Sequence, residues 1–280
     1  MNVVLSLILT ASPLLLITLG ALISEYAGRL AMFMESIINL GAFFCFVFSL
    51  KFNSLFLGIV LSVLICTLIV FILDLISTKL NASVFLISIA INLLLSALCS
   101  FLSAQIFGTR GVLYDQNFVF SQTNAKIISS VFCYISSFAI IFTLYFSRTG
   151  LKIRITGSDP DVLSAQGNNP MNFRFLSWII ASSAGALAGC AYAMRISSFV
   201  PGMSGGRGWT ALAAVFLGRK NPLFVIGAIF VFSIAEYASS YIQNISVFEH
   251  IPSSVLLALP YIISLVLILI IPQKKQLEEK

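Results

Sequence analysis

Residues 200–221 read VPGMSGGRGWTALAAVFLGRKN and lie between two long apolar runs, at 173–193 and 222–244. The stretch contains five glycines, one proline and three basic residues, which do not suit an uninterrupted membrane helix. In hydrocarbon, an interrupted helix is tolerated only where protein or a water-filled cavity satisfies the freed backbone groups. Interrupted helices of this kind build substrate sites in transporters. The stretch therefore predicts a transport protein with a broken, re-entrant element in its second half.

The rest of the chain has the composition of a polytopic membrane protein. Of its 280 residues, 59% are hydrophobic and 9% are charged, against roughly a quarter charged in soluble domains. Apolar runs long enough to cross about 30 Å of hydrocarbon recur along the whole length. We expect one transmembrane domain over residues 1–280, an all-α helical bundle with broken, re-entrant helices. The net charge of +6 is spread over the loops and forms no patch for nucleic acid.

The cysteines and the N-terminus point to no redox, metal or secretory role. None of the cysteines forms a CxxC or Cys/His cluster, so we expect small packing residues and no metal or cofactor. All five lie in apolar runs, at Cys45, Cys66, Cys99, Cys133 and Cys190. The N-terminal run has no Lys or Arg before it, which is unlike a cleaved signal peptide. The first run is therefore expected to remain as a membrane span.

The apolar runs predict the membrane spans. The expected spans are 3–23, 35–50, 54–76, 83–107, 127–146, 173–193, 208–218, 222–244 and 254–271. The run at 208–218 would reach only about 16 Å as a helix, half of the hydrocarbon. We therefore expect a half-helix there.

The basic residues predict the orientation of the spans. The loop at 147–173 carries Arg148, Lys152 and Arg154, and the C-terminal tail carries three further lysines. Both segments are therefore expected in the cytoplasm. The connection at 108–126 has only two basic residues and is expected outside. Nine crossings that start from an outer N-terminus satisfy these assignments.

A second irregular element lies at residues 24–36, SEYAGRLAMFMES. Here Glu25, Arg29 and Glu35 interrupt two apolar runs around a glycine. Each half of the chain thus has a charged, glycine-containing break, and such pairs are the best sequence pointer to a central transport site. The alternative is that Glu25 and Arg29 form only a local ion pair, because they are four residues apart.

Polar side chains inside apolar runs are candidates for the transport path, because a carboxylate in hydrocarbon must be paired or face water. Asp74 lies just before a loop and is expected at the membrane interface. Glu236 could face the interior of the bundle. Asn92 is a lone amide in the middle of a span; it either bridges helices or reaches the path, and we favour the path. The predicted substrate-path residues are Glu25, Glu35, Asn92, Ser204, Gly205 and Trp209.

The cytoplasmic loop at 147–173 contains a capped segment, GSDPDVLSAQGNN, at residues 157–169. Asp159 suits the N-cap, Pro160 suits the first helical position and Gly167 suits the stop. The pattern predicts a helix of about two turns on the cytoplasmic side. An ordinary capped loop is the alternative, but a short rigid helix is what a motor subunit needs to grip. The predicted coupling residues are Asp159, Pro160, Asp161, Val162, Leu163 and Gly167.

The sequence gives no support for an enzyme. It has no GxxxxGK[ST] phosphate loop and no Ser/His/Asp arrangement, so any ATP hydrolysis is expected in a partner subunit. The single histidine, His250, stands beside Glu249 in a short polar loop and is expected to be a surface or interface residue.

Four segments resemble one family. The pattern GxxALAAVxxGRxNP begins at Gly208 and ends at Pro222, and it is preceded by a glycine-rich turn. Together with residues 21–36, 100–108 and 150–169, it resembles the permease subunits of bacterial ABC importers in the branched-chain amino acid, ribose and nucleoside group. The nucleoside-type permeases look most similar.

The resemblance implies an importer permease fold in the bacterial inner membrane, with several partners. Family members work as permease pairs with two cytoplasmic ATPase subunits and an extracytoplasmic substrate-binding lipoprotein. It also implies that residues 157–169 engage the ATPase. The implied substrate is nucleoside-like. Riboflavin is the alternative, since Tyr26, Ala31 and the Asn81-Ala82 pair depart from the nucleoside-type pattern where substrate contacts are expected.

Two other classes of function are compatible with intramembrane acids. One is a proton-coupled secondary transporter that uses Glu25, Glu35 and Glu236 as relays. The other is a membrane subunit of a quinone-linked electron-transfer chain. An ATP-driven importer needs a separate ATPase and continues to work when the proton gradient is dissipated, whereas a proton-coupled transporter behaves in the opposite way.

Overall fold

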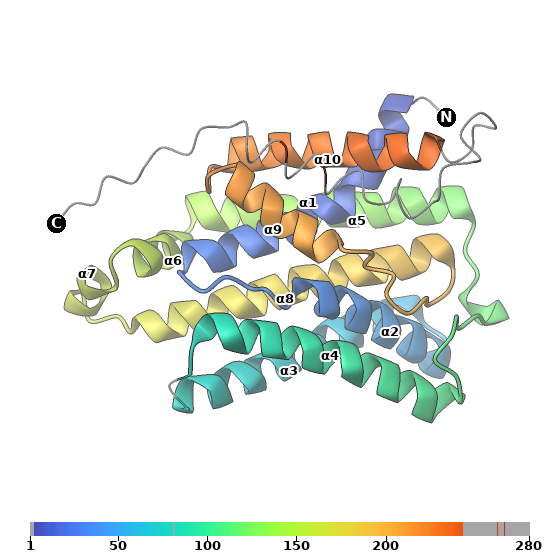
Figure 1. Ribbon diagram of the computed structural model, residues 1–280, viewed down its shortest axis with the longest axis horizontal. Coiled ribbons are helices and arrows are strands. Elements are labelled where there is room, and N and C mark those ends of the chain that lie inside the picture. The colour runs from blue at the N-terminus through green and yellow to red at the C-terminus, as the bar shows by residue number, and fades with distance from the viewer. Residues whose placement is uncertain (1–2, 81, 243–261, 263–265, 267–280) are drawn as a thin grey trace.

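The computed structural model describes residues 3–80, 82–242, 262 and 266, which are helical over most of their length (Figure 1). Among these residues, seven helices are long and apolar enough to cross a membrane. The elements are α1 (Val3–Tyr26), α2 (Met34–Phe52), α3 (Leu55–Lys79), α4 (Val84–Phe107), η1 (Gln116–Phe118), α5 (Gln122–Phe146), α6 (Arg148–Ser158), α7 (Pro160–Ala165), α8 (Pro170–Ile196), α9 (Arg207–Leu217) and α10 (Pro222–Ile242). The expected all-α bundle is confirmed. His250, the lysine-rich tail and nearly all of the expected span at 254–271 lie outside the described residues.

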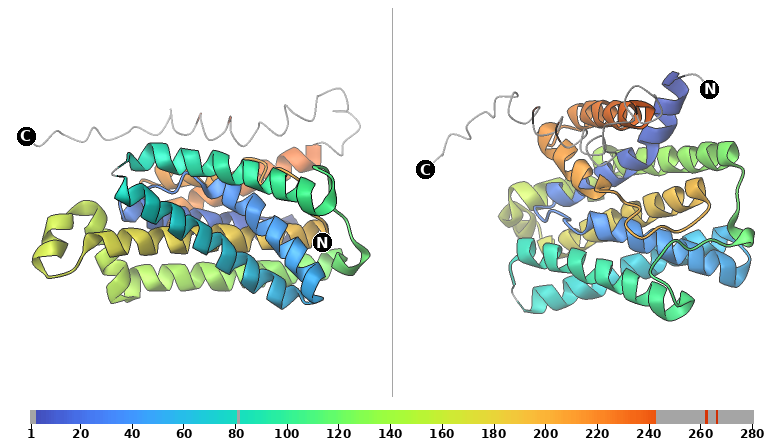
Figure 2. Two further views of the ribbon diagram at one scale, coloured as in Figure 1. Left: turned by 90° about the horizontal axis from the view of Figure 1, so that it is seen from below. Right: turned by 45° about the vertical axis from the view of Figure 1, so that its right-hand side comes forward.

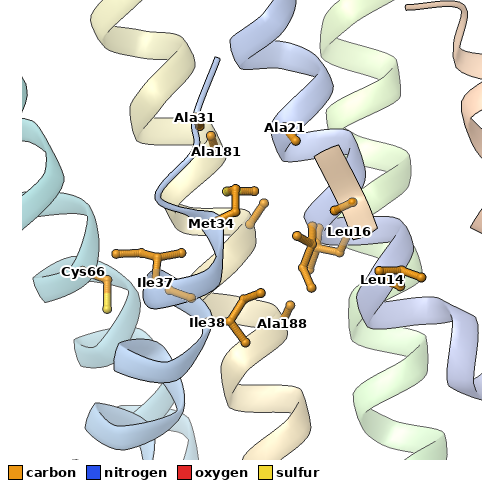
Figure 3. Packing of buried hydrophobic residues seen from close by; sticks show 14 of the residues in the cluster. Leu14, Leu16, Ala21, Ala31, Met34, Ile37, Ile38, Cys66, Ala181 and Ala188 are labelled. Atoms are coloured by element: carbon orange, nitrogen blue, oxygen red, sulfur yellow. The ribbon is translucent and has the colours of Figure 1, made fainter. Parts of the chain in front are cut away.

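Helix α8 lies at the centre of the bundle and packs against α1, α2, α3 and α5. Its small residues allow the backbones to approach closely, as in many membrane helix pairs. A Cβ on Gly41 of α2 would lie 2.6 Å from the Cα of Ala186 on α8. Figure 3 shows part of the packing between these helices, with Ile38 of α2 beside Ala188 of α8. Close contact between the backbones of α2 and α8 therefore contributes to the core together with the packing of large side chains.

Two irregular segments interrupt the bundle, and we name them the first break (residues 27–33, between α1 and α2) and the second break (residues 197–206, between α8 and α9). Helices α1 and α8 run in opposite directions, and after each of them the chain turns back into the middle of the bundle before the next helix begins (Figure 1). The two breaks thus have inverted paths, as in transporters built from inverted repeats. Helix α9 has 11 residues, so the expected half-helix is confirmed.

The two loops that we assigned to opposite sides of the membrane lie at opposite ends of the bundle. Helices α6 and α7 extend beyond the spans at one end, whereas η1 lies at the other end (Figures 1 and 2). Helix α1 begins at the η1 end, which agrees with an outer N-terminus. We refer below to the α6–α7 end as cytoplasmic and to the η1 end as outer.

A proline in α1 creates a requirement that the sequence analysis missed. Pro13 has no N–H, so the carbonyl of Leu9 lacks its helical donor. The guanidinium of Arg195 at the end of α8 donates to this oxygen at 2.9 Å, and the hydroxyl of Ser130 on α5 donates to it at 3.1 Å. Arg195 therefore holds α1, α5 and α8 together near the outer end. The sequence signal for this contact was Arg195 itself, a lone basic residue in an apolar run.

Candidate functional site

The carboxylate of Glu35, in the first turn of α2, binds the second break. One oxygen accepts from the amide of Gly206 at 2.7 Å and from the hydroxyl of Ser204. The other accepts from the amide of Gly208 at 2.8 Å. Gly206 and Gly208 lie at the N-terminus of α9, where unpaired amides and the helix dipole favour an anion. Glu35 therefore caps the half-helix from a different part of the chain.

Asn39 lies one turn after Glu35 and completes this contact. Its side-chain oxygen accepts from the amide of Ser204 at 3.0 Å, and its nitrogen donates to the Ser204 hydroxyl at 2.7 Å. We call Glu35, Asn39, Ser204 and the two glycine amides the latch. Sequence reasoning named Glu35 and Ser204 but missed Asn39, although a polar side chain four residues from Glu35 on an apolar helix was visible.

The geometry requires the glycines at the end of the second break and at the start of α9. Gly205 and Gly206 have positive φ angles of 52° and 81°, a region that favours glycine. A Cβ on Gly208 would lie 2.6 Å from the Cα of Glu35. The amides of Gly206 and Gly208 are not open to a ligand, because the Glu35 carboxylate accepts from both.

Side chains of α4 accept hydrogen bonds from backbone amides of the first break and of the first turn of α2. The hydroxyl of Ser88 accepts from the amide of Met32 at 2.7 Å, and the side-chain oxygen of Asn92 accepts from the amide of Ser36 at 3.0 Å. Ser88 and Asn92 are four residues apart and lie on one face of α4. Asn92 therefore has the bridging role that we had weighed against the transport path, and its contact with substrate remains a prediction.

A buried ion pair fixes the first break to α3. The guanidinium of Arg29 lies 2.8 Å from the carboxylate of Asp74, and the two side chains are 5% and 1% exposed. Trp178 of α8 donates from its indole nitrogen to the Arg29 carbonyl at 2.7 Å. The alternative of a local Glu25–Arg29 pair is therefore wrong, and Asp74 is buried inside the bundle, while its depth in the membrane stays a prediction. Helix α1 ends at Tyr26, so helical spacing no longer relates Arg29 to Glu25.

The cytoplasmic end of the first break contacts both α9 and α6. Glu25 pairs with Lys220, which follows α9, at 2.7 Å, and the Tyr26 hydroxyl donates to the Lys220 carbonyl. On the other side, a Cβ on Gly157 of α6 would overlap the Tyr26 carbonyl oxygen and lie 2.9 Å from the amide of Gly28. Helix α6 therefore packs directly on the backbone of the first break.

Two further predicted residues lie toward the surface of the described structure. Glu236 of α10 accepts from the guanidinium of Arg207 at 2.8 Å, and this guanidinium stands over the ring of Tyr192. Trp209 of α9 is 42% exposed. Of the predicted path residues, the structure brings Glu35, Ser204 and Gly205 together in or beside the latch, places Asn92 behind the first break, and places Glu25 at the cytoplasmic end.

The cytoplasmic helix forms where the capping signals predicted it. The carboxylate of Asp159 accepts from the amides of Asp161 and Val162 at 3.1 and 3.3 Å, and α7 begins at Pro160. Gly167, just beyond the helix, has a φ of 74°. Sequence reasoning missed α6, which starts one residue after its N-cap Ser147 and runs directly into α7.

Comparison with known proteins agrees with this architecture. The family model described as the permease component of the branched-chain amino acid transport system matches residues 3–272. The chain is 25% identical to the nucleoside ABC transporter permease protein NupC of Lactococcus lactis, over 95% of this chain and 90% of that protein. It is 27% identical to the guanosine ABC transporter permease protein NupQ of Bacillus subtilis, over 91% and 87%.

A solved structure has the same fold. The chain aligns with PsaBC from Streptococcus pneumoniae in complex with Fab at a TM-score of 0.54 and 14% identity, over 99% of this chain and 95% of that one. The chain therefore belongs to the branched-chain amino acid transport system permease family, and it is a multi-pass permease component of an ABC transporter in the bacterial inner membrane.

Proposed function

We propose that this permease imports nucleosides, together with a second permease subunit, cytoplasmic ATPase subunits and an extracytoplasmic substrate-binding lipoprotein. The observation that carries the substrate class is the similarity along most of the chain to permeases named for nucleosides and guanosine. The latch agrees with it, because the charge of Glu35 is taken up by backbone amides and a hydroxyl. A neutral solute with several hydroxyls suits such surroundings better than an ion.

The proton-coupled alternative fits the geometry less well. A proton relay needs acids that can take up and release protons along a path. Each of the three candidate acids is held by a specific partner: Glu25 by Lys220, Glu35 by the second break and Glu236 by Arg207. Riboflavin gains no support from the relatives named above and stays as a control substrate.

The function is tested by uptake in cells that carry the complete importer. We expect uptake of labelled uridine or guanosine that disappears when the partner ATPase is inactivated and persists when a protonophore dissipates the proton gradient. Uptake of riboflavin instead of nucleosides would change the substrate class. An ATP-driven importer would be contradicted by the opposite result: uptake that is lost when a protonophore is added but is unchanged when the ATPase is inactivated.

We further propose that α7 is the docking element for the ATPase. Val162 is 45% exposed, whereas Leu163 is fully buried at the base of the helix. Only Val162 can therefore report on docking, and a change at Leu163 tests folding.

Replacing Val162 by aspartate is expected to lower uptake at least about tenfold, the effect of losing roughly 1.4 kcal/mol of docking free energy. The amount of permease in the membrane should not change, because the side chain is exposed. Val162→Thr keeps the shape without a charge and is expected to transport normally. Leu163→Asp is expected to reduce the amount of folded permease. Normal coupling of ATP hydrolysis to uptake in Val162→Asp would refute docking through this face.

A further inference from the structure

A polar pocket of about 230 Å³ lies beside the latch, between α2, α4 and the second break. Its lining includes Asn39, Ser96, Ser100, Ser103, Phe199 and Gly202. At its outer side, the backbone of Phe199 pairs with that of Leu113 in the loop after α4, with hydrogen bonds of 2.8 and 3.0 Å. At its inner side it reaches Asn39, a member of the latch. The pocket therefore lies between the outer end of the bundle and the latch.

The chemistry of the pocket suits a neutral solute with hydroxyl groups. Of the described residues that line it, none carries a charge. Three serines follow one face of α4, at Ser96, Ser100 and Ser103, and a serine hydroxyl both donates and accepts hydrogen bonds. These groups offer many weak, exchangeable hydrogen bonds, which permit release.

The size of the pocket points to a part of a ligand. Pockets that hold a whole drug-sized ligand measure about 300–1,000 Å³. The pocket therefore matches a single hydroxylated ring, such as a pentose, better than a complete nucleoside.

Small serines on a membrane helix usually serve helix packing, so the exposure of these positions matters. Ser100, Pro201 and Gly202 are exposed and Ser96 is partly exposed, so no described helix covers the mouth of the pocket. The Ser103 hydroxyl donates to the Thr109 carbonyl at 2.9 Å and keeps its acceptor capacity. Ser96 and Ser100 are therefore open to a solute in the described structure, whereas Ser103 is buried and holds the loop after α4.

We propose that this pocket receives the pentose-like part of a neutral ligand from the outer side and that the latch closes its inner end. The proposal rests on the proposed function and adds the place where the sugar is held. Inward movement then requires the second break to leave Glu35 and Asn39, because their hydrogen bonds to Ser204 hold the inner end of the pocket closed.

The first test is protection of an introduced cysteine in the complete importer. Ser100→Cys is made together with Cys99→Ala, and a membrane-impermeant maleimide is added from outside. We expect saturating uridine to slow labelling at least threefold and uracil, which lacks the sugar, to leave it unchanged. Gln105→Cys, in the same background, is exposed on α4 outside the pocket and is expected to show no protection.

The second test is transport by Ser96→Val, which fills the pocket with methyl groups and removes a hydroxyl. We expect the KM for uridine uptake to rise at least tenfold while the second permease still co-purifies. If Ser96→Val loses the second permease during purification and the complex that remains has an unchanged KM, the serine face of α4 is a helix-packing surface and the proposal is overturned. If the wild type takes up uridine but Ser100→Cys shows no protection and Ser96→Val shows no change in KM, the pocket is overturned while the proposed function stands. Absence of nucleoside uptake by the wild type overturns the proposed function as well.

Discussion

Replacing Asp74 by alanine is expected to reduce the free energy of unfolding by about 3–5 kcal/mol, the usual cost of removing one partner from a buried ion pair. The change leaves the guanidinium of Arg29 buried at the first break, where its side chain is 5% exposed. Because Arg29 also holds Trp178 through its carbonyl, we expect the whole break to lose its position. The measurement is the midpoint of thermal unfolding in detergent, together with the amount of monodisperse permease.

Two controls separate this effect from a general loss of charge. Glu25→Ala removes a pair whose Lys220 side chain is 53% exposed, and such surface pairs contribute only about 0–1 kcal/mol. The double variant Arg29→Met, Asp74→Leu replaces the buried pair by apolar side chains and should recover most of the stability. An Asp74→Ala protein as stable as the Glu25→Ala protein would show that the buried pair does not hold the break.

Replacing Gly208 by alanine is expected to remove most of the transport activity. The added Cβ would lie 2.6 Å from the Cα of Glu35, and a backbone atom cannot move aside as a flexible side chain does. Helix α9 must then move away from α2, which breaks the hydrogen bonds from Gly206 and Gly208 to the Glu35 carboxylate. The measurement is nucleoside uptake for each unit of permease in the membrane, and we expect it to fall by more than tenfold.

A glycine of α10 provides the matched control. Gly227 has no atom within 4 Å of the position of its missing Cβ, so Gly227→Ala adds a methyl group without a clash. Alanine is preferred over glycine in a helix by about 1 kcal/mol, so this variant is expected to transport normally and to be at least as stable as the wild type. Equal uptake by the two variants would remove the case for close contact between α9 and α2.

The sequence predicted those parts of the fold that depend on local patterns. Apolar runs located the long spans, glycine density located the second break, and the Asp159-Pro160 cap located α7. Each of these signals acts within a few residues of the structure that it specifies. The basic residues placed two loops on opposite sides of the membrane, and these loops lie at opposite ends of the bundle; which end faces the cytoplasm stays a prediction.

The contacts between distant segments could not be read in this way. The partner of Arg29 is Asp74 on another helix, and the partner of the Glu35 carboxylate is a set of backbone amides that no residue type reveals. A carboxylate in an apolar run indicates that some compensation exists, but its spacing in the sequence does not identify the compensating group. Asn39 was missed for the same reason, because its partners are the backbone and hydroxyl of Ser204.

The latch also has a consequence for how the protein is made. Glu35 precedes Gly206 by 171 residues, which takes roughly 9–34 s to synthesise at about 5–20 residues per second. During this interval α2 is already in the membrane while its carboxylate lacks the amides that later bind it. The nascent N-terminal half therefore carries an intramembrane acid without its final partner. The carboxylate gains its hydrogen bonds only when Gly206 and Gly208 have been synthesised. A chain truncated before Gly206 is therefore expected to keep an intramembrane carboxylate without the backbone amides that bind it in the complete protein.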